Sequence, residues 1–235
     1  MMNGAARKVD GIVFDKDGTL FDFHATWSVW AADTIRELAC GEALVMARIA
    51  EAIDYDLEAS AFRPTSPVIA GTNREAAECV ASALPGRSAD EIEHFLTITS
   101  ASAPLAPAVP LAPYLADLAA LGLALGVITN DSEYGARSHL ESAGVAAQFD
   151  FIVGFDSGHG AKPAPGPLLA FAKSMRLAPE RCVMVGDSTH DLMAGRRAGM
   201  QTLGVLTGMA SEAELAPLAD MVFPDIGHIP AWLTA

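Results

Sequence analysis

The fold of this chain is predicted first from residues 11–20, which read Gly11-Ile12-Val13-Phe14-Asp15-Lys16-Asp17-Gly18-Thr19-Leu20. It opens with a glycine and three large apolar residues, and its character changes abruptly at Asp15. A short apolar run bounded by glycine and a polar cluster is typical of a fully buried parallel strand. Residues 11–14 are therefore predicted to form such a strand, followed by a polar turn.

The second half of the chain alternates short apolar runs with segments of helical pattern. Predicted strands lie at 123–128, 151–153, 181–185, 202–206 and 221–223, and predicted helices at 132–143, 165–175 and 192–198. Strands that alternate with helices predict an α/β fold with a doubly wound, Rossmann-like parallel sheet and right-handed crossovers.

A helical block separates the first strand from this alternation. Apolar residues between 24 and 60 recur at three- and four-residue spacings, which is the periodicity of helices. A further helix is predicted over 73–84. Ser88 and Glu91 then form a capping-box pattern, which predicts the start of another helix.

Three prolines mark the end of this block, at positions 104, 107 and 110. We therefore expect an α/β core domain made of residues 1–20 and 101–235. Residues 21–100 are expected to form an inserted helical cap domain.

Composition narrows the class of protein. The 235 residues are 51% hydrophobic and carry a net charge of −14, so a surface built to hold nucleic acid or an anionic membrane is not expected. No apolar run has the length of a membrane span, and no signal peptide is expected. Cys40, Cys79 and Cys182 are far apart in the sequence and are interpreted as reduced thiols of a cytoplasmic protein. Monomer and homodimer both stay open.

Polar residues follow four of the predicted strands. In an open parallel sheet, ligands bind outside the carboxyl ends of the strands, so these residues are predicted to meet at one crevice. They are Asp15, Asp17, Thr129, Asn130, Lys162, Asp187 and Asp191. Carboxylate and carbonyl oxygens suit a hard cation such as Mg²⁺ better than they suit zinc.

Four motifs in this order carry a family resemblance. They are Asp15-x-Asp17-Gly18-Thr19, Ile128-Thr129-Asn130, Lys162-Pro163 and Gly186-Asp187-x-x-x-Asp191. Together they resemble the haloacid dehalogenase-like hydrolase superfamily, in the helical-cap subgroup that includes phosphoglycolate phosphatases. The resemblance spans essentially the whole chain. It implies Mg²⁺-dependent hydrolysis of a small phosphomonoester, such as phosphoglycolate or a sugar phosphate, through an aspartyl-phosphate intermediate.

The resemblance and the chemistry together imply two different roles for the first pair of carboxylates. Asp15 is expected to attack phosphorus as the nucleophile. Asp17 is expected to protonate the leaving oxygen and then to activate water, which Asp15 cannot do while it is esterified. The dehalogenase branch of the superfamily lacks this second aspartate, so Asp17 favours a phosphatase.

The remaining motif residues are expected to bind phosphate or metal. Gly18, Thr129 and Asn130 are predicted to donate hydrogen bonds to phosphoryl oxygens, and Lys162 to pair with both the phosphoryl group and Asp15. The resemblance makes Asp187 a direct Mg²⁺ ligand beside Asp15 and the main-chain carbonyl of Asp17. Asp191 is expected to act through water or to orient Lys162, or it simply favours the N-terminus of its helix.

Substrate specificity is expected to come from the cap, where Arg63, Thr65 and Ser66 form a polar loop. If Arg63 meets a second anionic group, a carboxylated substrate such as phosphoglycolate is favoured; a surface arginine beside a helix connection is the alternative. Two other functions stay open. One is a phosphomutase of the same superfamily, and the other is a non-catalytic binding protein on this fold.

Overall fold

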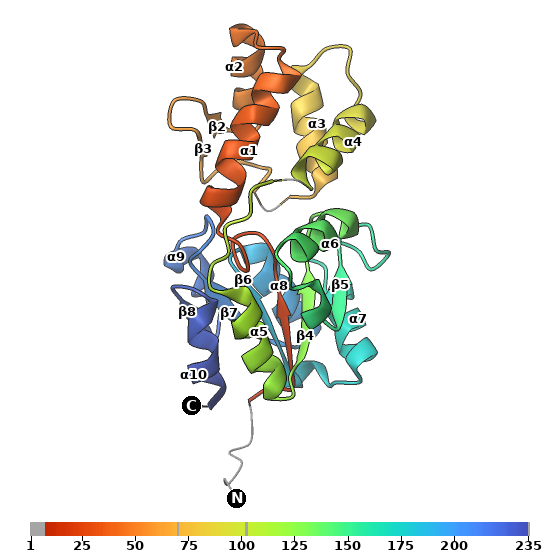
Figure 1. The fold of residues 1–235 in the computed structure, drawn as a ribbon, viewed down its shortest axis with the longest axis vertical. Coiled ribbons are helices and arrows are strands. Elements are labelled where there is room, and N and C mark those ends of the chain that lie inside the picture. The colour runs from red at the N-terminus through yellow and green to blue at the C-terminus, as the bar shows by residue number, and fades with distance from the viewer. Residues whose placement is uncertain (1–7, 70, 102, 235) are drawn as a thin grey trace, which may run out of the picture.

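A six-stranded parallel sheet forms the centre of the lower half of the molecule in Figure 1. The computed structural model describes residues 8–69, 71–101 and 103–234. The strand order is β5-β4-β1-β6-β7-β8. The strands are β1 (Gly11–Phe14), β4 (Ala124–Ile128), β5 (Phe151–Val153), β6 (Cys182–Gly186), β7 (Gln201–Val205) and β8 (Met221–Phe223). The predicted α/β class with a doubly wound parallel sheet is confirmed.

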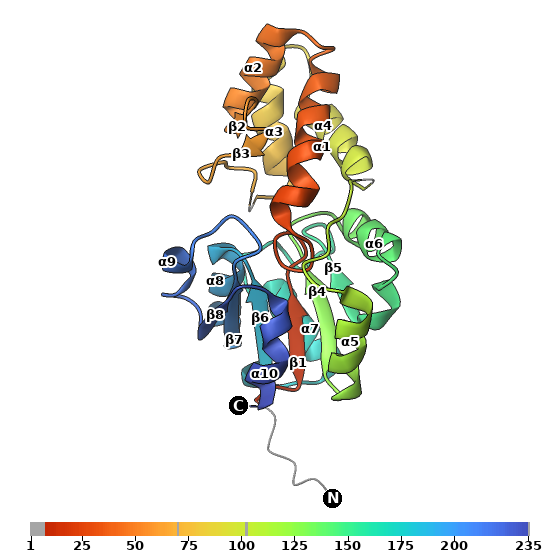
Figure 2. The ribbon, with the colours of Figure 1, turned by 60° about the vertical axis from the view of Figure 1, so that its left-hand side comes forward.

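Helices cover both faces of the sheet, as Figure 2 shows. Successive residues of a strand point to opposite faces. Accordingly Ile12 and Phe14 join an apolar cluster with α5 (Leu111–Ala120) and α10 (Ile229–Thr234). Val13 joins another with α7 (Gly166–Met175) and α8 (Thr189–Ala198). All four residues of β1 are buried, which explains why its sequence is continuously apolar.

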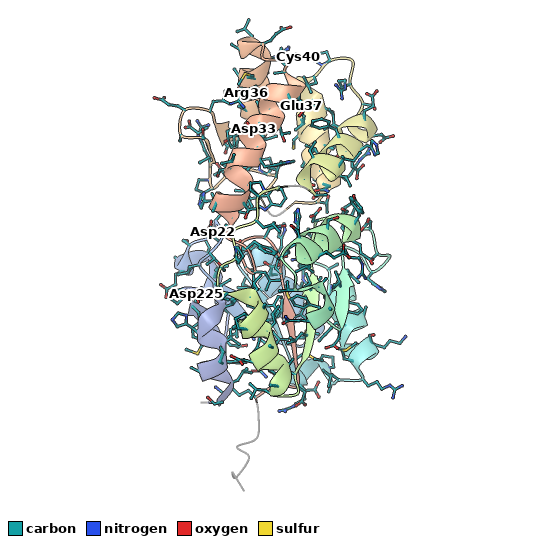
Figure 3. The ribbon with its side chains drawn as sticks, in the orientation of Figure 1. Asp22, Asp33, Arg36, Glu37, Cys40 and Asp225 are labelled. Atoms are coloured by element: carbon teal, nitrogen blue, oxygen red, sulfur yellow. The ribbon has the colours of Figure 1, made fainter. Side chains whose placement is uncertain are left out.

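Residues 23–101 form a separate group of helices above the carboxyl ends of the strands, which we call the helical unit (Figure 1). It contains α1 (Phe23–Leu38), α2 (Ala43–Ala52), α3 (Asn73–Ala83) and α4 (Ala89–Ser100), and it has its own apolar core. Helix α1 faces that core with residues three or four positions apart, which are Phe23, Trp27, Ala31, Ile35 and Leu38. Asp22, labelled at the base of α1 in Figure 3, caps this helix through the Ala25 N–H.

The predicted capping box of α4 is present, since Ser88 and Glu91 each accept a hydrogen bond from the other's main-chain N–H. The segment 24–60 differs from its helical prediction in its last part. A two-stranded hairpin, β2 (Tyr55–Asp56) with β3 (Ala61–Phe62), follows α2. Asp54 and Ser60 have positive φ angles of 50° and 51°, which a helix cannot accommodate.

Three helices were not predicted from the sequence, namely α5, α9 (Glu212–Leu215) and α10. In α5, Pro113 lies in the first turn, where its missing N–H costs no hydrogen bond. Helix α8 begins at Thr189 rather than at 192, because Ser188 and Asp191 form a capping box. The remaining helix on the sheet is α6 (Glu133–Ser142), and η1 (Ala146–Gln148), η2 (Pro179–Arg181) and η3 (Ile226–His228) are single 3₁₀ turns.

Within the described residues, no helix is both long enough and apolar enough to cross a membrane. The expectation about a signal peptide concerns a segment that falls largely outside the described residues.

Candidate active site

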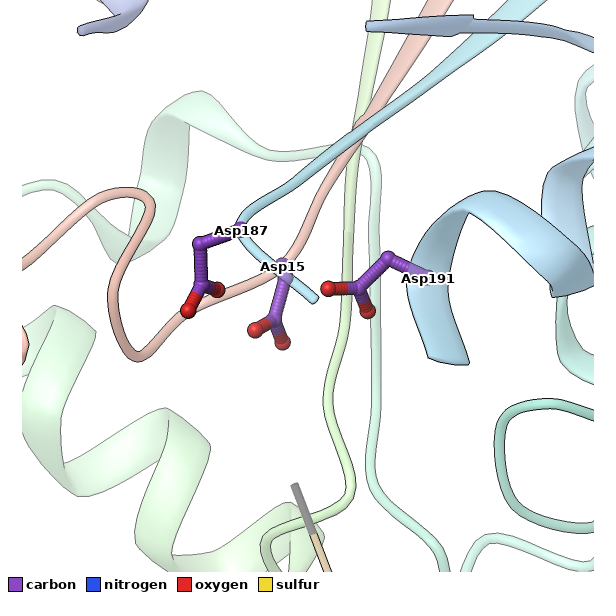
Figure 4. Close-up of side chains that lie close together, drawn as sticks. All are labelled: Asp15, Asp187 and Asp191. Carbon is purple, nitrogen blue, oxygen red and sulfur yellow. The ribbon is translucent and has the colours of Figure 1, made fainter. Parts of the chain in front are cut away.

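Three aspartates meet at the carboxyl ends of β1 and β6, as Figure 4 shows. Asp15 directly follows β1, Asp187 directly follows β6, and Asp191 lies in the first turn of α8. One carboxylate oxygen from each lies within 4.8 Å of the others, and all three residues are buried. β1 pairs with β6 in parallel register, with Phe14 opposite Val185, so the two strands end side by side. The topology therefore brings together the carboxylates predicted from two separate motifs.

Lys162 supplies the positive charge at this cluster. Its Nζ lies 2.7 Å from Asp15 Oδ1 and 2.6 Å from Asp191 Oδ1, and its side chain is 3% exposed. Asn130 holds Lys162 in place. The Asn130 side-chain amide donates to the Lys162 carbonyl at 2.9 Å, and its Oδ1 accepts from the Lys162 N–H at 2.9 Å. Both ends of this amide therefore bind the main chain of Lys162, a role that the motif alone did not reveal.

Burial dominates the electrostatics of the cluster. Desolvation raises the pKa of Asp15 to about 7, although the charge of Lys162 opposes this rise. Burial and the neighbouring Asp15 charge also raise the pKa of Asp187 well above its ordinary value. Burial alone would lower the pKa of Lys162, but the charges of Asp15 and Asp191 outweigh it and the pKa is raised. One ammonium thus faces three carboxylates.

This excess of buried negative charge fits a hard divalent cation. The backbone also approaches Asp187 very closely. A Cβ added to Gly18, whose φ is +80°, would lie 2.3 Å from Asp187 Oδ2, and one added to Gly208 would lie 1.7 Å from the same atom. Only glycine fits at these two positions, because any side chain would displace the Asp187 carboxylate. Thr19 Oγ1 donates to Asp187 Oδ1 at 3.3 Å and helps to orient it.

The side chain of Asp17 lies outside this carboxylate cluster. It is 18% exposed, and its two oxygens lie 2.9 and 2.7 Å from Lys16 Nζ. The indole N–H of Trp27, in the first part of α1, also donates to Asp17 Oδ1 at 2.9 Å. The residue predicted to be the acid and base is therefore held by the helical unit as well as by its own loop.

Lys16 is fully buried, and four different side chains surround it. Its Nζ lies 3.2 Å from Asp131 Oδ2, 2.8 Å from His139 Nδ1 and 5.2 Å from the centre of the Trp27 ring, in addition to its contacts with Asp17. Two carboxylates and an aromatic face compensate the buried charge. No role was predicted for Lys16, because the motif Asp15-x-Asp17 leaves the residue at this position open.

The structure also fixes which nitrogen of His139 carries the proton. Lys16 can only donate to Nδ1, and Nε2 lies 2.6 Å from the carbonyl oxygen of Ser100, which can only accept. His139 is therefore neutral with its hydrogen on Nε2. Burial, together with the Lys16 ammonium, keeps the pKa of His139 below its ordinary value.

Two cavities adjoin the cluster, and a third adjoins the first of them. The acidic cavity, of about 50 Å³, is lined by the three aspartates together with Asp17, Thr129 and Lys162, among others. The aromatic cavity, of about 100 Å³, adjoins it and lies mainly within the helical unit. Asp17 and Asp131 line both of these cavities. The outer cavity, of about 280 Å³, is reached past Asp187 and His190.

Of the residues predicted to set specificity, only Ser66 lines one of these three cavities, the outer one. Arg63 binds Asp54 and Asp56 at 3.2 and 3.1 Å, its side chain is 54% exposed, and it lines a different surface pocket. Thr65 donates its hydroxyl to Asp54. The polar loop is thus tied to the hairpin of the helical unit, and Arg63 is not brought to the site.

Comparison with known proteins gives the same family as the motifs. Residues 9–199 match the family model described as a haloacid dehalogenase-like hydrolase. The phosphoglycolate phosphatases of Escherichia coli K12 and Salmonella paratyphi A are each 37% identical over 102 residues. These matches cover 42% of this chain and 40% of each relative, so the chain aligns with about two fifths of their length.

Solved structures of similar shape cover nearly the whole chain. CbbY from Rhodobacter sphaeroides, in complex with phosphate, has a TM-score of 0.71 and 21% identity, covering 97% of this chain and 100% of its own. A β-phosphoglucomutase from Clostridium difficile has a TM-score of 0.65 and 18% identity, covering 95% and 96%. At these identities the likeness concerns the fold.

Proposed function

The chain belongs to the haloacid dehalogenase-like hydrolases, and on that premise we propose that it hydrolyses a small phosphomonoester with Asp15 as the nucleophile. The observation that carries the proposal is the buried Lys162 ammonium, 2.7 Å from Asp15 and 2.6 Å from Asp191. A lysine in this position offsets the charge of a nucleophilic carboxylate and of an incoming phosphate dianion, so that the two anions can approach each other.

In the first step, an oxygen of the Asp15 carboxylate forms a bond to phosphorus while the bond from phosphorus to the leaving oxygen breaks. The Asp17 carboxyl gives its proton to that oxygen, and a neutral alcohol departs. Asp17 lies at the boundary of the acidic and aromatic cavities, which suits a group that must reach the leaving oxygen. Thr129 and the turn at Gly18 supply donors for phosphoryl oxygens.

In the second step, Asp17 is a carboxylate and takes a proton from water. The water oxygen attacks phosphorus, the bond to Asp15 breaks, and inorganic phosphate is released. Asp15 is then a carboxylate again and Asp17 a carboxyl, so the cycle closes with its atoms and protons balanced. Lys162, positioned by Asn130, keeps its contact with Asp15 available in both steps.

We propose Mg²⁺ as the cofactor, held by Asp15 and Asp187 with the main-chain carbonyl of Asp17, while Asp191 acts through Lys162. When bound, the ion would offset negative charge on the transferring phosphoryl group. The chain's own contribution is to keep these carboxylates close together and buried.

The finer features of the protein are proposals of the same kind. We propose that residues 21–100 act as a cap domain on a core of residues 1–20 and 101–235. The partner would be a small phosphorylated metabolite of the cytoplasm, with no role for nucleic acid or membrane, and the protein would act as a monomer or a homodimer.

The test is release of inorganic phosphate from a panel of phosphomonoesters in the presence of Mg²⁺. We expect turnover by the natural sequence, none above background for Asp15→Asn, and full activity for Asp117→Asn, which makes the same change on the exposed side of α5. Sugar phosphates that interconvert without phosphate release would identify a phosphomutase instead. Turnover by Asp15→Asn at the natural rate would overturn the nucleophile.

A further inference from the structure

The aromatic cavity has a defined lining, and the reaction proposed above assigns no part of the substrate to it. Seven of its lining residues are large and apolar, namely Phe23, Trp27, Trp30, Phe62, Val68, Ile69 and Leu96. Apolar pockets with a few convergent polar groups are the usual form of small-molecule sites. A dry cavity of about 150 Å³ accommodates benzene. At about 100 Å³, and with lining residues shared with the acidic cavity, this one suits a short branched chain or a single ring that is only partly enclosed.

The position of Asp17 favours the aromatic cavity over the outer cavity as the binding place of the leaving group. The proposed acid must touch the oxygen that leaves, and Asp17 lines the acidic and aromatic cavities but not the outer cavity. Trp27 reinforces the link, because it lines the aromatic cavity and donates its indole N–H to Asp17. A group bonded to the leaving oxygen therefore extends from Asp17 into the aromatic cavity, beside Trp27.

The charges around the aromatic cavity disfavour a second anion. Its described lining contains two aspartates, Asp17 and Asp131, and no lysine, arginine or histidine. Lys16 lies behind these two carboxylates, is fully buried and is paired with both of them. A carboxylate on the leaving group would thus lose water and meet like charges without a free cation, which is costly.

Two polar atoms of lining residues have no hydrogen-bond partner among residues 8–69, 71–101 and 103–234, namely the indole nitrogen of Trp30 and Oδ2 of Asp131. Both atoms are buried, and the Asp131 oxygen is paired by charge with Lys16, so neither offers a hydrogen bond at the cavity wall. The lining is mainly apolar, and the cavity therefore calls for an apolar body with at most limited polarity.

We infer that the alcohol released by this enzyme is uncharged and largely apolar, with an aromatic ring or a branched alkyl group bound in the aromatic cavity. This inference rests on the proposed phosphatase function and narrows it. It places phosphoglycolate, whose leaving group carries a carboxylate, among the poor substrates of this chain.

The test compares benzyl phosphate with phosphoglycolate, because both release a primary alcohol and differ in what is attached to it. We expect kcat/KM to be at least tenfold higher for benzyl phosphate, in line with the discrimination that an apolar pocket can provide. A second comparison uses benzylphosphonate and phosphonoacetate, which are not hydrolysed. Their binding, followed by tryptophan fluorescence in the presence of Mg²⁺, should differ in the same direction.

A variant that partly fills the aromatic cavity tests whether the leaving group binds there. Ala76 lies on α3, is only partly buried at the margin of the apolar core of the helical unit, and lines the aromatic cavity, so Ala76→Leu occupies space in that cavity. It should reduce the ratio of kcat/KM for benzyl phosphate over methyl phosphate at least tenfold. The matched control, Ala116→Leu, changes an exposed position of α5 and should keep the natural ratio.

The outcomes separate the two proposals. Turnover with a preference for phosphoglycolate, or an Ala76→Leu variant with an unchanged ratio, overturns the apolar leaving group and leaves the phosphatase intact. Tighter binding of benzylphosphonate without turnover of any ester overturns the phosphatase and supports the cavity. Tighter binding of phosphonoacetate overturns the apolar ligand whether or not turnover occurs.

Discussion

Replacing Lys16 by methionine tests whether the buried ammonium holds the two halves of the site together. Methionine keeps most of the volume of the lysine stem and removes its charge. The Asp17 and Asp131 carboxylates, 2.7 and 3.2 Å from Nζ, then lose their common cation. Breaking a buried ion pair by removing one partner costs about 3–5 kcal/mol, because the remaining charge stays desolvated.

The structure favours the lower end of this range. Asp17 is 18% exposed, so water can partly solvate it. Asp131 keeps two other donors, the Ser132 N–H at 2.6 Å and Asn73 Nδ2 at 3.0 Å. We therefore expect a loss of about 3 kcal/mol in the free energy of unfolding. For a chain of this length that corresponds to a fall in Tm of roughly 6–12 °C.

The assay is urea unfolding with thermal melting of the metal-free protein. Lys173→Met, an exposed position near the end of α7, is the matched control and should stay within about 0.5 kcal/mol of the natural sequence. Combining Lys16→Met with Asp131→Asn should cost at least about 0.5 kcal/mol less than the sum of the single changes, since one of the two carboxylates that lost their cation is then uncharged. A Lys16→Met loss below about 1 kcal/mol, or simple additivity, would refute the reasoning.

The same experiment carries a pH dependence through His139, whose pKa is lowered by burial and by Lys16. Between the ordinary histidine pKa of about 6.5 and the lowered native value, the unfolded chain binds a proton that the folded chain does not. Stability from this group is therefore complete above about pH 6.5 and decreases as the pH falls below it. In Lys16→Met one cause of the lowered pKa is removed, so the decrease should become shallower. An unchanged slope would mean that Lys16 does not act on His139.

Three further predictions follow from the site and the surface. Asp187→Asn should raise the Tm of the metal-free protein, because it relieves repulsion among buried carboxylates. It should also abolish the stabilisation of about 2.7 kcal/mol that is expected from Mg²⁺ at 100 times its Kd. A Mg²⁺-induced Tm shift equal to that of the natural sequence would contradict Asp187 as a metal ligand. Trp27→Phe removes a hydrogen bond to Asp17, so it should reduce kcat for alkyl phosphates by about tenfold or more. The reduction should be much smaller for 4-nitrophenyl phosphate, because its leaving group needs no proton. Equal losses for both substrates would mean that Trp27 does not act through the acid Asp17. Iodoacetamide should modify exposed Cys40, labelled at the far end of α1 in Figure 3, well before buried Cys182, because burial raises the pKa of the latter thiol to about 11 and the thiolate is the reactive form; mass spectrometry of the digested protein measures the order.

The sequence predicted those parts of the structure that depend on local pattern. The apolar run before Asp15, the capping box at Ser88 and the polar residues at strand ends each report a local requirement of backbone or burial. Parallel strands end at one edge, so the meeting of Asp15, Asp187 and Lys162 followed from topology without any knowledge of distances. Helix α5 was not predicted, and its Pro113 is compatible with a helix because a proline is tolerated in the first turn.

Other parts of the site depend on partners that are distant in sequence. Lys16 contacts His139, which lies 123 positions away in the sequence, and no local pattern predicts that contact. Asn130 was expected to face phosphate, whereas its amide is occupied by the main chain of Lys162, 32 positions away. The position of Arg63 was likewise not predicted, because its aspartate partners lie at the start of a hairpin in a segment that was predicted to be helical.

The place of β1 in the sheet has a consequence for how the chain is made. β1 is the first strand of the sheet to be synthesised, and among the described residues it pairs with β4 and β6, of which the nearer begins roughly 110 residues later. At a synthesis rate of about 5–20 residues per second, the strand waits roughly 5–20 s for its first hydrogen-bonding partner. The helical unit, whose contacts are local, is complete in the meantime. The proposed nucleophile is thus synthesised well before the strands that fix its position, and an apolar strand stays without its sheet partners during that interval.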